Sequence, residues 1–132
     1  MQMESLVAYT SHQVRSVIIA VTHYPDFLPG CAWVHILDQG SSHLVARMHL
    51  SMGLAVTTRM HWTDCAVFLE NPFVRGQWLL APWSDGTKVS LHLEWLGVGP
   101  LAKLVQGLWP RYAPVMQRAF EGQLHAQYKI IN

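Results

Sequence analysis

The sequence predicts an α+β domain in which an antiparallel sheet of six to seven strands wraps around one long C-terminal helix. From Ala32 to about Val98, apolar and polar residues alternate with a period of two, and turn residues recur about every 8–12 positions with no helix between them. From Pro100 onward the apolar spacing changes to three and four, as in an amphipathic helix. A twisted antiparallel sheet has one apolar face, and a long amphipathic helix is the element that covers it.

Length and composition fit one domain over residues 1–132. Apolar residues make up 51 % of the chain and charged residues 13 %, against the usual ~25 % charged. This is more apolar surface than a small core needs, so we expect part of it to line a cavity or meet a partner. The net charge of +1 provides no steering field, so no nucleic-acid partner is expected.

Compartment and redox state follow from what the sequence lacks. Cys31 and Cys65 have no Cys-x-x-Cys spacing, so we expect two buried free thiols. The first residues show neither the basic nor the apolar region of a signal peptide. The longest uninterrupted apolar run, Val17 to Val21, is far shorter than the ~20 residues that span a bilayer. We therefore expect a cytoplasmic protein, and leave open peripheral contact with the inner face of a membrane.

The N-terminal third predicts a strand, a helix and a tight turn. Residues 4–9 are typical of a short strand. Thr10 is placed to cap a helix, with Gln13 completing a capping box. The apolar face of this helix consists of Val14, Val17, Ile18 and Val21. Pro25 is expected to end it.

The middle of the chain predicts a meander. Leu44, Ala46, Met48 and Leu50 alternate with polar or outward residues, which indicates a half-buried strand. Reversals are expected at residues 51–53 and 84–87. The further strands are expected at residues 55–62, 65–70, 77–83 and 89–95.

The C-terminal helix is the longest periodic signal. Pro100 suits its first position, and apolar residues keep helical spacing from Leu101 to Phe120. Pro110 and Pro114 each remove a backbone donor. We therefore expect the helix to bend between Gly107 and Pro114.

The most informative segment is residues 23–31, His-Tyr-Pro-Asp-Phe-Leu-Pro-Gly-Cys. Pro25 starts a helical turn, and Pro29 with Gly30 stops it. The segment resembles the coenzyme Q-binding family of START-like domains, part of the polyketide cyclase/START superfamily with its helix-grip fold. Supporting motifs are Thr57-Thr58-Arg59, Asn71-Pro72-Phe73, Trp78, the strand 89–93 and the stretch 116–120. A short central hairpin, the two helix prolines and six tryptophans depart from the family pattern.

The resemblance implies a function. Members of that family bind a polyprenyl quinone or a related lipid, and some bacterial relatives are described as inhibitors of ribosomal subunit association. We therefore expect a carrier or chaperone for a hydrophobic small molecule, an isoprenoid quinone or another lipid, with no cofactor. The alternatives are a small polyketide cyclase or aromatase and a ribosome-associated interaction protein. A purely apolar cavity would favour the carrier. A cavity that contains unpaired polar groups would favour the cyclase. A collapsed core together with a basic surface patch would favour the interaction protein.

Strand and helix parity defines the expected ligand cavity. Thioethers and flat rings on inward faces suit a long apolar ligand. The expected lining is Phe27, Leu28, Met48, Met60, Trp62, Trp78, Leu91, Leu93, Leu108, Tyr112 and Met116.

Neither a metal site nor a catalytic group is assigned. The eight histidines lack the close spacing that zinc ligands need, and His49 and His92 alternate with apolar residues, which places them on the solvent face. No Ser-His-Asp or Cys-His grouping can be placed in one cavity, and Tyr112 is the one titratable hydroxyl on the apolar face of the C-terminal helix. An enzyme is therefore the less favoured reading.

Overall fold

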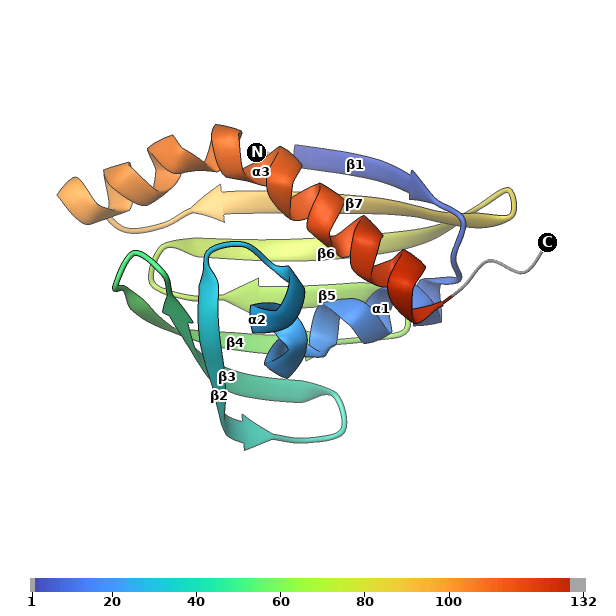
Figure 1. Cartoon of the computed structure of the whole chain (residues 1–132), viewed down its shortest axis with the longest axis horizontal. Helices are drawn as coiled ribbons and strands as arrows, with labels where there is room; N and C mark the ends of the chain where they lie inside the picture. The colour runs from blue at the N-terminus through green and yellow to red at the C-terminus, as the bar shows by residue number, and fades with distance from the viewer. Residues whose placement is uncertain (1, 129–132) are drawn as a thin grey trace.

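The computed structural model describes residues 2–128. Its centre is a seven-stranded antiparallel sheet in the order β1-β7-β6-β5-β4-β3-β2, with the helices on one face (Figure 1). This confirms the predicted fold class. The strands are β1 (Gln2–Val7), β2 (Cys31–Gln39), β3 (His43–Leu50), β4 (Ala55–Trp62), β5 (Ala66–Glu70), β6 (Val74–Trp83) and β7 (Gly86–Trp95).

The first helix, α1 (Ser11–Ile19), begins as expected and ends earlier. The Thr10 side chain accepts a hydrogen bond from the Gln13 backbone, and the Gln13 side chain accepts one from the Thr10 backbone, so the capping box is confirmed. Pro25 does not end this helix. After a 3₁₀ turn, η1 (Val21–His23), Pro25 lies in the first turn of a separate helix, α2 (Tyr24–Phe27), where a missing N–H costs nothing.

Three strands begin before their expected positions because pairing, not local pattern, sets their ends. β1 covers Gln2–Val7 rather than 4–9, since it pairs with β7 from Gln2 opposite His92 to Val7 opposite Thr87. β6 begins at Val74 rather than at 77, because Val74 pairs with Trp95. β7 begins at Gly86 rather than at 89, because Gly86 pairs with Trp83.

The parity of β3 is as predicted. Leu44 and Ala46 are buried, Met48 is half-buried and Arg47 is exposed. The turn to β4 contains Gly53 at φ +91°, a conformation that L side chains rarely adopt. One face of this strand therefore points to the helices and the other to solvent.

The long helix α3 (Pro100–Gln127) contains Pro110 and Pro114. Its helical hydrogen bonding continues past both, yet its axis changes direction near the middle (Figure 1). The expected bend is present without a break. The buried residues of α3, Met116, Phe120 and Leu124, all lie in its second half.

Cys31 and Cys65 are both free thiols. Cys31 is buried, as expected, but Cys65 is exposed, because it lies in the turn that leads into β5 rather than on the inward face. Within residues 2–128, no helix is long and apolar enough to cross a membrane.

Candidate functional site

An aromatic cluster lies between the sheet and the helices. Phe120 of α3 makes edge-to-face contacts with Tyr24 at 5.6 Å, Phe27 at 5.4 Å and Trp78 at 5.5 Å between ring centroids. Such pairs add to the stabilisation from burial. The cluster joins α2, α3 and β6 at the centre of the space between the sheet and the helices, which we call the grip.

The residues that the sequence places in a cavity have different degrees of burial. Met60, Trp78, Leu91 and Met116 are buried. Six more pack partly buried against that core: Phe27, Leu28, Met48, Trp62, Leu93 and Tyr112. Leu108 differs, since 39 % of its surface is exposed; it lies in the first half of α3, which contains none of the helix's buried residues. That these residues enclose one continuous ligand space stays a prediction.

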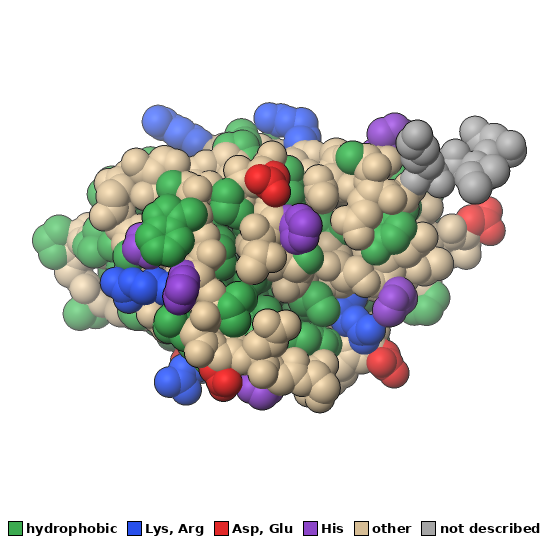
Figure 2. Space-filling model, turned by 60° about the horizontal axis from the view of Figure 1, so that its bottom comes forward, with side chains coloured by type: hydrophobic (Ala, Val, Ile, Leu, Met, Phe, Trp, Pro, Cys, Tyr) green, Lys and Arg blue, Asp and Glu red, His purple; other side chains and the backbone are tan. Residues whose placement is uncertain are grey.

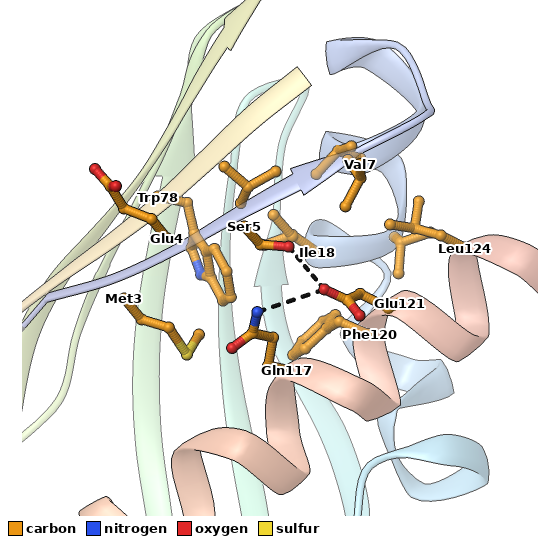
Figure 3. A pocket seen from close by; sticks show the side chains of 13 residues that line it. Met3, Glu4, Ser5, Val7, Ile18, Trp78, Gln117, Phe120, Glu121 and Leu124 are labelled. Carbon is orange, nitrogen blue, oxygen red and sulfur yellow. Dashed lines mark hydrogen bonds between the residues drawn. The ribbon is translucent and has the colours of Figure 1, made fainter. Parts of the chain in front are cut away.

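One pocket lies at the β1 side of the grip (Figure 3). Its walls come from β1, α1, β6, β7 and α3, and Trp78 is the one residue it shares with the expected cavity. Its volume is about 30 Å³, room for about two water molecules. The lining is Met3, Glu4, Ser5, Val7, Val14, Val17, Ile18, Trp78, Val89, Gln117, Phe120, Glu121 and Leu124.

A small polar cluster lies at the edge of this pocket. The Ser5 hydroxyl donates to Glu121 Oε1 at 2.7 Å, and Gln117 Nε2 donates to the same oxygen at 3.4 Å. Figure 3 shows both bonds, with Glu121 between strand and helix. The bond from Ser5 joins β1 to α3, and the bond from Gln117 lies within α3. The Glu121 carboxylate therefore has a structural role, since it holds the helix to the edge of the sheet.

Two tyrosines and Cys31 form the polar part of the core near α2. The Tyr24 hydroxyl donates to the Ile18 carbonyl, and the Tyr112 hydroxyl donates to the Pro29 carbonyl at 2.7 Å. Burial, and then the nearby Cys31, raises the pKa of Tyr112 to about 12; burial likewise raises the pKa values of Tyr24 and Cys31. All three groups are therefore neutral at physiological pH, which suits a packed core rather than a proton-transfer site.

The opposite face of the sheet carries a broad open groove of about 590 Å³ over β4 to β7. Two rows of side chains cross it, as the strand register requires. They are His61–Phe68–Gln77–His92 and Arg59–Glu70–Arg75–Glu94. In the second row Arg75 pairs with Glu70 at 3.3 Å and with Glu94 at 3.6 Å.

Flat rings stack on this outer face at two places. Trp33 of β2 lies on His49 of β3 with centroids 3.6 Å apart and planes within 10°. His61 of β4 lies on Phe68 of β5 at 4.7 Å and 14°. Figure 2, which brings the β2–β3 side forward, shows a cluster of hydrophobic, histidine and Lys/Arg side chains beside one another at one end.

Alternation along each strand predicts that His49 and His92 lie on the solvent face, but it does not connect the outer residues into a surface. Strand parity gives the face, whereas the stacks depend on cross-strand register, Trp33 opposite His49 and His61 opposite Phe68. No single-strand pattern contains that information. Across residues 2–128, no three His, Cys, Asp or Glu side chains are grouped to hold a metal ion.

Solved structures share this architecture. The Zhui aromatase/cyclase from Streptomyces sp. R1128 matches with a TM-score of 0.82 and 17 % identity, over 98 % of this chain and 94 % of that chain. A STAR-related lipid transfer protein from Xanthomonas axonopodis matches with a TM-score of 0.78 and 15 % identity, over 94 % and 84 %. At such identities the likeness shows the fold alone, that of the polyketide cyclase/START superfamily.

Sequence relatives are more specific. No sequence-family model matches the chain, and the narrower coenzyme Q-binding family is not confirmed. The persistence and stress-resistance toxin PasT of Escherichia coli is 29 % identical over 127 residues, 88 % of this chain and 80 % of that protein. The ribosome association toxin RatA of Vibrio cholerae is 31 % identical over 100 residues, 68 % of this chain and 69 % of that protein. On this identity and coverage, the chain belongs to the RatA family.

Proposed function

We propose that this chain is an interaction protein that associates with a ribosomal particle. Its relative of 31 % identity is named a ribosome association toxin, which is the alternative that the sequence left open. The observation that carries the proposal is the small size of the pocket between the sheet and the helices. At about 30 Å³ it is an order of magnitude below the ~300–1,000 Å³ of typical ligand pockets.

The surface supports the same proposal. The sequence criterion for an interaction protein is a collapsed core with a basic patch. The Phe120 aromatic cluster packs inside the grip, and the outer sheet face carries exposed arginines and stacked rings. A net charge of +1 averages over all faces, so it does not exclude a local basic surface.

Sedimentation tests the proposal directly. Purified protein is mixed with purified small and large ribosomal subunits, and sucrose gradients are run at magnesium concentrations that permit subunit joining. We expect the protein to sediment with one of the subunits and to lower the fraction of joined ribosomes. Protein that stays at the top of the gradient, with subunit joining unchanged, would contradict the proposal.

A second candidate is binding of a hydrophobic ligand, an isoprenoid quinone or another lipid, inside the grip. The observation that favours it is the apolar wall of the pocket, which has the carboxylate of Glu121 at its edge. Three side-chain hydrogen bonds join α3 to the rest of the described chain: Ser5–Glu121, Tyr9–His125 and Tyr112–Pro29. A lipid would enter by displacing α3, which those few bonds permit.

Mass spectrometry tests this second function. Protein purified from its own cells is extracted with organic solvent, and the lipids are quantified against the protein. A quinone or lipid near one molecule per chain would support the carrier. An extract that matches that of an unrelated protein purified in parallel would count against it.

A further inference from the structure

We infer that the outer face of β2–β5 is a binding platform for single-stranded RNA. The inference rests on the proposed function, because it names RNA as the part of the ribosomal particle that the chain contacts. Three features of this half of the face support it: its charge, its exposed rings and their spacing.

The charge is one-sided on β3 and β4. These two strands contain Arg47 and Arg59 and no Asp or Glu. Both arginines are exposed, and neither has an acidic partner among residues 2–128. Arg47 donates to the Thr57 hydroxyl at 3.3 Å. Glu70 lies opposite Arg59 in the register, but it forms its ion pair with Arg75 at 3.3 Å.

The other half of the sheet is different. Arg75 is neutralised by Glu70 and Glu94, and Lys88 pairs with Glu4 at 3.5 Å. On β2, Asp38 lies on the same face opposite Val45, and its contact is with His43 at 3.4 Å. Among residues 2–128, the outer-face arginines that form no ion pair are therefore Arg47 and Arg59 of β3–β4. That placement complements a phosphate backbone, which attracts such cations and releases counterions when it binds.

The rings supply what a single strand needs besides charge. Trp33 is 50 % exposed while one face of its indole lies on His49. His61 and Phe68 form the second flat surface. Unpaired bases stack on exposed aromatic rings of this kind, and sheets are a common scaffold for them. The bases of a duplex are already stacked on one another, so a single strand is the better fit.

The spacing lets one strand contact both stacks. His61 lies opposite His43, six residues along β3 from His49, which is ~20 Å at 3.4 Å per residue. Arg47 and Arg59 lie between these two positions, in the register pairs Arg47–Thr57 and Val45–Arg59. A strand crossing β3 and β4 would stack at each end and place phosphates near the two arginines.

The test is fluorescence anisotropy with a labelled oligouridylate of about 12 nucleotides, within the range of known single-strand sites. Trp33→Ala should weaken binding about 5- to 150-fold, the range for loss of one stacked base. Trp33→Phe keeps an aromatic ring and should weaken RNA binding less than Trp33→Ala does. Arg47→Ala/Arg59→Ala should lower the slope of log affinity against log salt by about 1.4, or ~0.7 per charge.

A matched control removes two charges from another face. Lys103→Ala/Arg111→Ala takes the same charge from exposed positions of α3 and should leave affinity and salt slope unchanged. Thermal unfolding of every variant checks that it is folded. Failure of the wild-type chain to bind the RNA, or equal losses in the arginine pair and the α3 pair, would overturn the inference.

The same variants in the ribosomal gradients separate the two proposals. Association that is lost with Trp33→Ala and kept with the α3 pair supports both. Association that persists in all variants leaves the ribosomal function standing and overturns the RNA platform. RNA binding without ribosomal association would contradict the proposed function alone.

Discussion

The two core tyrosines show how a single hydroxyl is used in this fold. Tyr24 is 7 % exposed, and its hydroxyl is the partner of the Ile18 carbonyl, near the end of α1. This bond holds α2 against the end of α1, across the turn η1. The Tyr24 ring packs on Phe27 and Phe120. The hydroxyl therefore fixes the turn that the proline-bracketed segment begins.

Tyr24→Phe should lower the free energy of unfolding by about 1–2 kcal/mol, because it leaves a buried carbonyl without its donor. Urea unfolding measures the change. Tyr9→Phe is the control, since its hydroxyl makes a solvent-exposed contact of 3.4 Å to His125, and it should change stability by less than ~0.5 kcal/mol. Equal losses of stability in the two variants would mean that the buried bond to Ile18 stabilises the fold no more than the exposed contact of Tyr9 does.

Tyr112 makes stability depend on alkaline pH. Its pKa is raised to about 12 by burial and by Cys31, above the ~10 of an unfolded tyrosine. The folded chain therefore keeps a proton that the unfolded chain loses, so this contribution is complete below about pH 10 and declines as pH rises from 10 to 12. The free energy of unfolding, measured with urea between these pH values, should fall less steeply with pH for Tyr112→Phe than for wild type. Parallel curves would contradict the assignment.

Among the elements, those defined by local chemistry were predictable from sequence. The capping box of α1, the parity of β3 and the bend of α3 depend on neighbouring residues, and each is present. The starts of β1, β6 and β7 were not, because their partner strands set them. β1 shows this most clearly, since its register is fixed by β7. The end of α1 was not predicted either, because η1 and α2 form separately after it.

Two glycines test how tightly the elements fit. A Cβ on Gly86 would lie 1.9 Å from the Val7 carbonyl oxygen, whereas one on Gly107 of α3 would meet nothing within 4 Å. Gly86→Ala should therefore destabilise the fold by more than ~2 kcal/mol, because β1 has to move off β7. Gly107→Ala should stabilise it by about 0.5–1 kcal/mol through helix propensity. Thermal unfolding of the two variants should give shifts of opposite sign, and shifts of the same sign would contradict this account.

At the scale of the whole molecule, the interior and the outer face divide the candidate functions. The sequence identified inward residues such as Met60, Trp78 and Met116, which are buried, but burial of each does not say whether they pack together or surround a space. The outer platform was missed for a related reason. Its stacks are pairs between strands, and net charge conceals two arginines on one face.

A substitution that fills the pocket tests whether the interior or the outer face of the sheet is responsible for ribosomal association. Val17 lines the 30 Å³ pocket and is 2 % exposed. Val17→Ile adds one methylene to that space and should raise the free energy of unfolding by up to ~0.8 kcal/mol. Val21→Ile, at a position 1 % exposed that does not line the pocket, should overpack and cost ~1–3 kcal/mol.

Ribosomal association should be the same for Val17→Ile and wild type, because the outer face is untouched. If the chain carries a lipid, the content of that lipid should fall in Val17→Ile. A variant that loses ribosomal association while remaining folded would place the interaction site on the helix side of the sheet, since α1 and the outer face lie on opposite sides of it.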